Sequence, residues 1–431
     1  MTGVDPGTAH RSIGGERSAA FIILLVFVFL TAAFYRDFSH LGISLGGTTI
    51  FVTELTIALI IGLLTLEVLR TGLVSLRFAP SATFAILFVL WGVVCLYRGR
   101  TGGMISLREY ATNYYAIFYL LVALVAHTPR RLSVLTTTIV AGAILAFGIV
   151  LWRVVTGEGL ATPTGTLRYS APIAVGGAST FFFLAAPAAT SGRRILLAGG
   201  ACIALLVAVV ATQHRSAAIA MVAAVASWIG WFHVGRGRGS IGSRKAVTIA
   251  IACAALLILI IPQVANQTVA RFVSIGIDRD DADSAWRLLV WRLLFSKLEE
   301  APLVGFGFGD NIPAFEFRGV TYGMDPSIPV GVHNSFLFVL YKEGLVGLIL
   351  LVGFASQLVY RSSRSLRGET SDRSWIASAS LAGFVFVGVF ALFNVVLEGP
   401  YMSMLFWLYA GIGEGVLLRQ AGDVHGRSVG V

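Results

Sequence analysis

Charged residues are scarce in this chain. Only 13% of its 431 residues are Asp, Glu, Lys or Arg, whereas 56% are hydrophobic. A soluble globular protein carries about 25% charged residues. Apolar stretches of about 17–25 residues recur along the whole length, and each is long enough to cross a bilayer of roughly 30 Å. The composition therefore leaves no room for a large soluble domain and predicts an all-α polytopic membrane protein.

Cysteine is also rare. Cys95, Cys202 and Cys253 all fall in apolar stretches, and none belongs to a CxxC motif or a Cys/His cluster. A disulfide framework or a structural zinc site is therefore not expected, and we expect no metal and no other cofactor. The net charge of +10 does not indicate a nucleic-acid partner, because basic cytoplasmic loops are typical of membrane proteins.

Length and apolarity predict about twelve membrane spans. They lie near residues 19–35, 50–69, 79–97, 110–127, 132–155, 172–190, 195–212, 216–234, 246–262, 334–360, 374–393 and 401–418. If the tail 1–18 is cytoplasmic, every inner loop is basic, as the positive-inside rule requires. The chain then consists of a membrane domain at 19–262 with helices 1–9, one large outer loop at 263–333, helices 10–12 at 334–418, and a cytoplasmic tail at 419–431.

The outer loop contains a predicted helix at 281–302. Asp283 or Ser284 can cap its start, and Pro302 follows its end. One apolar face is expected from residues spaced three and four apart, namely Leu288, Trp291, Phe295 and Leu298. Arg287 then falls in the first turn, where free N–H groups and the helix dipole favour an anion. A phosphate site and an ion pair with a nearby aspartate are both compatible with that position.

A glycine-rich segment, "PLVGFGFGDN" at 302–311, follows this helix. It is not a dinucleotide-binding fingerprint, because it neither follows a strand nor opens a helix in a βαβ unit. Gly305, Gly307 and Gly309 instead predict a tight backbone path close to the bilayer.

Three polar residues interrupt "VGVHNSFLFVLYKEGLVG" at 330–347, namely His333, Lys342 and Glu343. A helix over 334–360 would be about 40 Å long at 1.5 Å per residue, which exceeds the roughly 30 Å hydrocarbon core. The helix is therefore expected to tilt or to project outward, with its continuous membrane part closer to 344–360. Lys342 and Glu343 then lie near the outer boundary, where they can pair. Gly344 and Gly347 are expected to allow close helix packing.

The predicted topology gathers other polar residues on the outer side. Arg215, in "ATQHRSAAIAMV", lies at a span boundary, where an arginine marks either a functional site or a side chain that snorkels to the interface. Arg108, Arg168 and Tyr169 lie in short outer loops. Arginines recognise phosphate oxygens, and a histidine such as His333 can orient a hydroxyl or accept its proton. The set suits a diphosphate substrate handled without a metal.

These motifs resemble a known family. "RxxxW" at 287–291, "PLVGFGFG" and "HNSFLFVLYKEGLVGL" are similar to the signature region of the O-antigen ligase and O-antigen polymerase superfamily. "QHRSA" resembles the short arginine motif of that family, although Gln-His precedes Arg215 and Ser216 replaces the usual small residue. The span count and the single large outer loop also match.

The resemblance implies a GT-C-type membrane glycosyltransferase of the bacterial plasma (inner) membrane, with both termini cytoplasmic. Such an enzyme moves a glycan from a polyprenyl (undecaprenyl) diphosphate-linked oligosaccharide to a sugar hydroxyl of a glycan or lipid-glycan acceptor, with inversion and without metal. His333 would activate the hydroxyl, and Arg215 and Arg287 would bind the donor diphosphate. The possible further phosphate or glycan contacts are Arg108, Arg168, Tyr169 and Glu398. Membrane lipids are the other expected partner, with no nucleic acid.

Two other classes of protein remain open. A lipid-linked glycan flippase or another transporter would also show many spans and intramembrane arginines, but with charges distributed along a central pathway. A structural or sensory membrane protein would have no reason to gather Arg215, Arg287 and His333 on one side. Ligase and polymerase share the donor chemistry and differ in the acceptor, which the sequence does not identify.

Overall fold

The computed structural model describes residues 18–45, 48–71, 79–126, 128–158, 160–161, 167–168, 182–183, 215–235, 282–323, 330–366 and 374–428. Within these ranges the chain is mostly helical, as the composition predicts. Three short antiparallel hairpins, which the sequence did not reveal, accompany the helices. Their strands are β1 (Gly42–Leu45) with β2 (Thr48–Phe51), β3 (Leu160–Ala161) with β4 (Leu167–Arg168), and β5 (Phe315–Phe317) with β6 (Val320–Tyr322).

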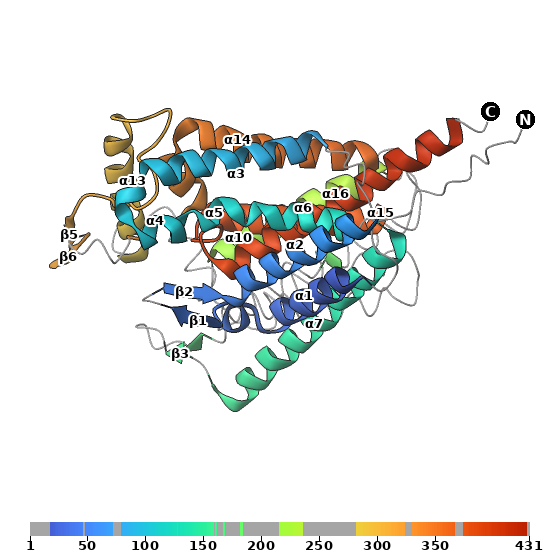
Figure 1. The fold of residues 1–431 in the computed structure, drawn as a ribbon. Coiled ribbons are helices and arrows are strands. Elements are labelled where there is room, and N and C mark those ends of the chain that lie inside the picture. Colours follow the sequence, from blue (N-terminus) through green and yellow to red (C-terminus); the bar gives the residue numbers. More distant parts are fainter. Residues whose placement is uncertain are drawn as a thin grey trace, which may run out of the picture.

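The helices carry the bulk of the fold (Figure 1). They are α1 (Ala19–Ser39), α2 (Val52–Thr71), α3 (Pro80–Arg98), α4 (Met104–Glu109), α5 (Ala111–Tyr114), α6 (Ala116–Val125), α7 (Pro129–Thr156), α10 (Arg215–Gly235), α13 (Ala282–Leu298), α14 (Ser335–Leu366), α15 (Ser374–Ala391) and α16 (Pro400–Ser428), with a 3₁₀ turn, η1 (Arg100–Gly102).

Six of the described helices are long and apolar enough to cross a membrane: α1, α2, α3, α7, α14 and α16. They correspond to the spans predicted at 19–35, 50–69, 79–97, 132–155, 334–360 and 401–418. Shorter apolar helical stretches occur at Ser216–Trp228 and Trp375–Ala391. The predicted spans at 195–212 and 246–262 lie outside the described residues, as does all of 172–190 except 182–183. The chain is a multi-pass helical membrane protein.

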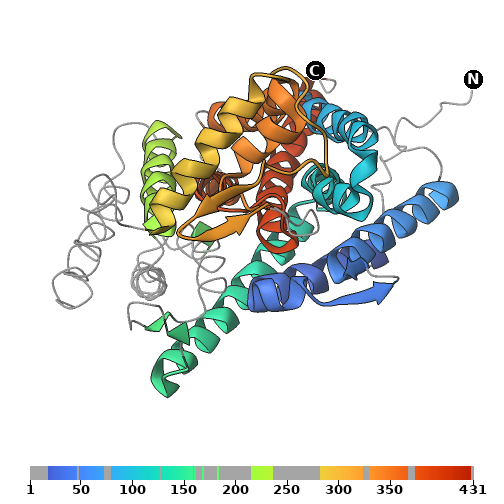
Figure 2. The same ribbon diagram turned by 90° about the vertical axis from the view of Figure 1, so that its left-hand side faces the viewer.

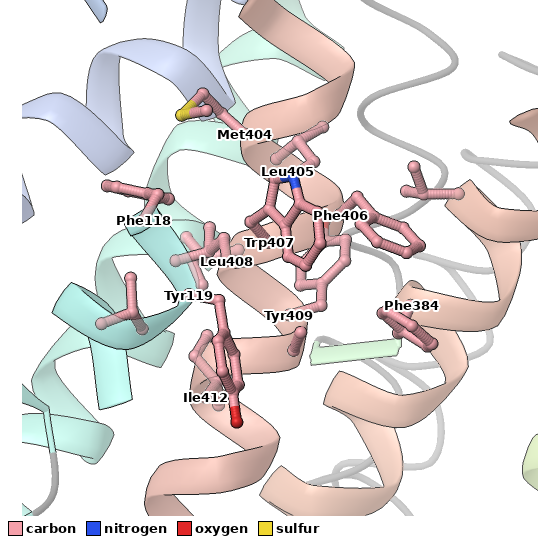
Figure 3. Close-up of a cluster of buried hydrophobic side chains, with 14 of the residues drawn as sticks. Phe118, Tyr119, Phe384, Met404, Leu405, Phe406, Trp407, Leu408, Tyr409 and Ile412 are labelled. Carbon is pink, nitrogen blue, oxygen red and sulfur yellow. The ribbon is translucent and has the colours of Figure 1, made fainter. Parts of the chain in front are cut away.

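Helix α16 forms the centre of the bundle. Its side chains are buried on every face from Met402 to Val416, and a helix that is apolar all round is buried. It packs against α6, α14 and α15. Figure 3 shows part of the aromatic cluster that results, around Trp407 and Phe406. The centroid of the Trp407 ring lies 5.0 Å from those of Phe354 and Phe406. The position of α16 therefore fixes the helices around it.

A partly buried ion pair links four helices toward the end of the bundle where α16 ends. Arg361 of α14 lies 2.7 Å from Glu414 of α16, whose side chain is 2% exposed. Ser81 of α3 and Tyr119 of α6 also donate hydrogen bonds to Glu414. A buried carboxylate is stable only with such partners, so this cluster holds α3, α6, α14 and α16 in register.

The opposite end of the bundle gathers the irregular structure. Figure 1 shows α4, α13 and the β1–β2 and β5–β6 hairpins at its left-hand end, while α16 ends at the right. Figure 2 views the left-hand end directly, with α13 and the β5–β6 hairpin in front of the end of α14 and α10 to one side. Because α13, β5 and β6 belong to the predicted outer loop, we refer to this end as the outer end.

Candidate functional site

The start of α14 fixes the backbone around His333. Asn334 caps the helix, since its Oδ1 accepts hydrogen bonds of 3.0 Å from the backbone N–H groups of Phe336 and Leu337. Before His333, the Val332 carbonyl accepts a 2.8 Å hydrogen bond from the indole of Trp291 in α13. His333 lies between these anchors with a φ of 51°, a conformation uncommon for residues other than glycine. His333 is thus held directly before the helix.

Helix α14 is broken at Gly344, where φ is 68° and ψ is −168°. The break lies where the continuous membrane part of this helix was predicted to begin, so the segment before it is a separate helical piece. Gly344 does not serve the packing of two helices. A Cβ at this position would collide with the Leu303 carbonyl and lie 2.5 Å from the Gly305 nitrogen. Glycine is required because both the backbone angle and the available space exclude a side chain.

The glycine-rich loop fills this break. Its backbone and that of α14 make four hydrogen bonds, which are Leu345 N to Pro302 O at 2.9 Å, Val346 N to Leu303 O at 3.1 Å, Phe306 N to Tyr341 O at 3.0 Å, and Gly307 N to Lys342 O at 2.8 Å. Backbone groups freed by the break are satisfied in this way, as buried backbone N–H and C=O groups require. The predicted tight path is confirmed, since Gly305, Gly307 and Gly309 have φ values of 63°, 86° and 84°.

Lys342 pairs with Glu109 of α4, and its predicted pairing with Glu343 is wrong. The Lys342 Nζ lies 2.8 and 2.7 Å from the two Glu109 carboxylate oxygens, and the two side chains are 4% and 10% exposed. Consecutive residues on a helix do not face each other, so Lys342 and Glu343 point to different neighbours. Glu109 also accepts a 2.6 Å hydrogen bond from the Gly309 N–H. The pair therefore fastens α14 and the glycine loop to α4.

Gly347 also has a role that differs from the prediction. A Cβ on Gly347 would lie 2.7 Å from Glu343 Oε2 and closer still to the Glu343 Cβ. The missing side chain therefore leaves room for the buried Glu343 carboxyl rather than for a neighbouring helix.

A cavity of about 410 Å³ lies beside the Lys342–Glu109 pair. Its polar wall comes from α4, the loop at 310–311, α14 and the loop before α16, and consists of Arg108, Glu109, Asp310, Asn311, Tyr341, Lys342 and Glu398. Apolar residues such as Val332 and Phe338 complete the wall. The volume is in the range of sites that bind small molecules, roughly 300–1,000 Å³, and such sites combine apolar walls with a few placed polar groups.

Asp310 is held firmly at this cavity. Its Oδ2 lies 2.6 Å from the Lys297 Nζ and accepts a 2.7 Å hydrogen bond from the Tyr341 hydroxyl. Its backbone carbonyl accepts a hydrogen bond from Lys342. Since Lys297 belongs to α13 and Tyr341 and Lys342 to α14, Asp310 joins both helices at the cavity wall.

Glu398 lines the same cavity and belongs to the loop between α15 and α16. Its Oε2 accepts hydrogen bonds from the Ser335 hydroxyl at 2.5 Å and the Val396 N–H at 3.0 Å. The residue keeps a little exposed surface where it lines the cavity, but protein atoms surround most of the carboxyl. This burial raises the pKa of Glu398 to about 7. Glu398 therefore anchors the start of α14 and also presents a titratable group to the cavity.

Arg215 is the first residue of α10, and its side chain lies outside what the structure describes. The next residue, Ser216, accepts a 2.9 Å hydrogen bond from Asn394 Nδ2. The Asn394 carbonyl in turn accepts a 3.3 Å hydrogen bond from Ser335. The start of α10 is thereby tied to the start of α14, so the backbone of Arg215 belongs to the same end of the bundle as His333.

Arg287 lies in the second turn of α13, because the helix begins at Ala282. The prediction that Asp283 or Ser284 precedes the helix, with Arg287 in the first turn, is therefore wrong. Arg287 itself is half-buried and stands four residues before Trp291, on the same face of the helix. That face packs toward Val332 and α14. The helix dipole therefore gives Arg287 no special affinity for an anion. The side of α13 that carries Arg287 nevertheless faces the His333 segment.

The apolar face of α13 agrees with the predicted one only in part, at Trp291 and Leu298. The residues buried against the rest of the fold are Val290, Leu294 and Leu298, whereas Leu288 and Phe295 are 65% and 48% exposed. Trp286 and Trp291 complete the packed side.

The remaining predicted contacts fall in different places. Arg108 is exposed and lines the cavity, with its guanidinium carbon 5.7 Å from the Phe51 ring centroid. Arg168 belongs to β4, but its side chain lies outside what the structure describes, as does all of Tyr169.

The segment that contains Arg215, Arg287 and His333 is similar to known proteins. Residues 200–352 match the family model described as O-Antigen ligase. This match confirms the resemblance to the O-antigen ligase superfamily. Two proteins named as polysaccharide ligases, from Rickettsia conorii and Rickettsia felis, are each 24% identical over 166 residues. The alignments cover 37% of this chain and 38% of the length of each relative.

The segment matched to the superfamily contains Arg215, Arg287 and His333, and the cavity adds residues that the motifs did not reveal. Glu109, Asp310 and Lys297 were missed because their roles depend on contacts between distant segments. The only local signals were the "RE" pair at 108–109 and the "GD" step that ends the glycine run. Among the described residues, no group of three or more His, Cys, Asp or Glu side chains could hold a metal ion.

Proposed function

We propose that this protein transfers a glycan from a polyprenyl (undecaprenyl) diphosphate donor to a sugar hydroxyl of a glycan or lipid-glycan acceptor. The reaction takes place at the outer face of the bacterial plasma membrane, inverts the sugar and needs no metal. The observation that carries this proposal is the 410 Å³ cavity at the outer end, whose wall includes the residues just before His333. The superfamily match over 200–352 supports the same class of reaction.

His333 is the proposed group that activates the acceptor hydroxyl. Its imidazole Nε2 lies 3.6 Å from the position that a Cβ on Gly331 would take, and Gly331 lines the cavity. The ring is therefore next to a residue of the cavity wall, which supports the proposal that it orients a hydroxyl there and accepts its proton. The glycosidic carbon becomes oxocarbenium-like in the transition state, so modest activation of the hydroxyl is sufficient.

Arginines are the proposed binding groups for the diphosphate. Charge develops on the leaving diphosphate, and fixed cations stabilise it most effectively in a partly dry cleft. Arg108 is in the cavity wall, and Arg215 and Arg287 are on the two helices beside the His333 segment. The two lysines nearby already have carboxylate partners, since Lys342 pairs with Glu109 and Lys297 with Asp310. A guanidinium group also matches two phosphate oxygens at once, which favours the arginines as phosphate ligands.

The carboxylates and amide of the cavity wall suit a sugar. Asp310, Asn311 and Glu398 offer hydrogen-bond acceptors beside the apolar side chains of Val332 and Phe338. This combination matches the hydroxyl groups and apolar faces of a sugar ring. Arg168 and Tyr169 remain predicted glycan contacts. Ligase and polymerase activity differ only in the acceptor that this wall receives.

Proteoliposomes that contain the purified protein, a lipid-linked oligosaccharide donor and a glycan acceptor test the proposal. Formation of a new glycosidic linkage, detected by mass spectrometry of the products, is the expected result. Movement of the donor across the bilayer without a new linkage would identify a transporter and contradict the proposal. Empty liposomes serve as the control for spontaneous movement.

A further inference from the structure

Glu343 is a fully buried carboxyl at the break in α14. Its side chain is 0% exposed, and its backbone carbonyl accepts a 3.0 Å hydrogen bond from the indole of Trp91 in α3. Asn113 of α5 donates from Nδ2 to Glu343 Oε2 at 3.0 Å and to the Phe88 carbonyl at 2.9 Å. Both amide hydrogens of Asn113 are thereby used, which fixes the orientation of its side chain.

Two oxygen atoms of the Glu343 and Asn113 side chains lack a hydrogen-bond partner in the described structure. Among the described residues, Glu343 Oε1 and Asn113 Oδ1 are buried and have no hydrogen-bond partner. Both atoms accept hydrogen bonds and neither can donate one if the carboxyl is ionised. Two buried acceptors without a donor are costly, so the arrangement lacks one hydrogen.

Positive charge to balance an ionised Glu343 is also missing from its described contacts. The adjacent cation, Lys342, is bound to Glu109 and to the Asp310 carbonyl. The titratable groups that face Glu343 from the neighbouring segments are the thiol of Cys95 in α3 and the hydroxyl of Tyr110 before α5, and neither carries a positive charge. An isolated ion in such a place normally takes up a proton instead.

We propose that Glu343 is held as a neutral carboxylic acid that forms a two-hydrogen-bond pair with Asn113. Oε1–H of the acid donates to Asn113 Oδ1, while Asn113 Nδ2 donates to Oε2. A single proton on Oε1 therefore gives both Glu343 Oε1 and Asn113 Oδ1 a hydrogen bond. The pair joins the break in α14 to α5 and, through the Phe88 carbonyl, to α3. It acts as a positioning pair for residues 335–343, the helical segment that His333 precedes.

Glutamine replaces a neutral glutamic acid almost atom for atom, which makes Glu343→Gln the decisive variant. Its side-chain N–H can donate to Asn113 Oδ1 and its carbonyl can accept from Nδ2. We expect the Tm of the wild-type protein in detergent to fall as the pH rises above about 4.3, the ordinary pKa of a glutamic acid, because the unfolded chain then releases this proton and the folded chain retains it. The difference between the two proteins should shrink toward low pH, since Glu343→Gln lacks this slope.

Two further measurements keep the test independent of folding and of the proposed activity. The infrared band of a protonated carboxyl should be present in wild type and reduced in Glu343→Gln, while the exposed Glu299 provides a matched control in Glu299→Gln. Glycan transfer, which rests on the proposed function, should be retained in Glu343→Gln and lost in Glu343→Ala. Transfer absent from all three proteins would contradict the proposed function alone, because the Tm and infrared readouts do not depend on it.

Three results would overturn the proposal. An unfolded Glu343→Gln variant would show that the negative charge is needed. An unchanged infrared band would show that Glu343 carries no proton. A Tm that rises with sodium chloride relative to choline chloride in wild type, but not in Glu343→Gln, would show that a bound sodium ion rather than a proton bridges the two oxygen atoms.

Discussion

Replacing Gly344 with alanine tests the broken helix on which the outer end is built. The φ of 68° and ψ of −168° lie in a region that is accessible almost only to glycine. The new methyl group would also meet the backbone of the 302–309 loop at Leu303 and Gly305. Neither obstacle is a flexible side chain, so the loop itself must move.

The magnitude follows from what the movement breaks. An unfavourable backbone conformation costs about 2 kcal/mol. The loop and α14 share four backbone hydrogen bonds across the break, and each contributes about 1 kcal/mol net. Gly344→Ala should therefore destabilise the protein by up to about 6 kcal/mol, a large part of the roughly 5–15 kcal/mol that stabilises a typical domain. Transfer should fall as well, because this loop braces the segment that follows His333.

Thermal unfolding in detergent and a transfer assay at a temperature below both Tm values measure the two effects. Gly148→Ala is the matched control, since Gly148 lies in α7 and no atom would come within 4 Å of an added Cβ. Alanine there should leave transfer unchanged and stabilise by up to about 1 kcal/mol, because it is the better helix former. A Gly344→Ala protein with the Tm and activity of wild type would refute the described break.

Two further predictions concern the charged groups around the cavity. Lys342→Met should destabilise the protein by about 3–5 kcal/mol because it leaves the Glu109 carboxylate buried without its partner. In thermal unfolding, adding Glu109→Gln to this variant should recover part of the lost stability. Purely additive effects of the two substitutions would argue against coupling between the two side chains. The pKa of Glu398 in the folded protein is raised to about 7. Above the ordinary pKa of a glutamic acid, the unfolded chain has released this proton while the folded protein still holds it. The free energy of unfolding should therefore fall as the pH rises toward about 7. Glu398→Gln should flatten the dependence of Tm on pH over that range, and an unchanged slope would assign it to other groups.

The sequence predicted the helices better than their contacts. Long apolar stretches located α1, α2, α3, α7, α14 and α16, because crossing a bilayer demands length and apolarity that the local sequence displays. The excess length of the 334–360 stretch also indicated where the continuous part of α14 begins. In α13 the periodicity was correct and the face was correct in part, since Trp291 and Leu298 lie on the packed side but Leu288 and Phe295 do not. Spacing alone cannot show which apolar side meets the rest of the fold.

The candidate site was predicted in part. The motifs point to His333, whose role stays a prediction, and the structure adds that Asn334 caps the helix that follows it. The partner of Lys342 was not predictable, because Glu109 is more than two hundred positions away in the sequence and only the folded α4 brings it near. The neighbouring Glu343 was the natural local choice. Pairings of this kind depend on how the helices and loops are placed in space, which local patterns do not encode.

Substitution of His333 tests the proposed mechanism most directly. His333→Ala should reduce the rate of glycan transfer by about 10²–10⁴-fold, the usual contribution of a general base, in an assay with purified protein, lipid-linked donor and acceptor. Protein level, Tm and donor binding should remain close to wild type. His40→Ala is the control, since His40 is an exposed histidine between α1 and β1, and it should transfer glycan at the wild-type rate. Full transfer activity in His333→Ala would contradict the assignment.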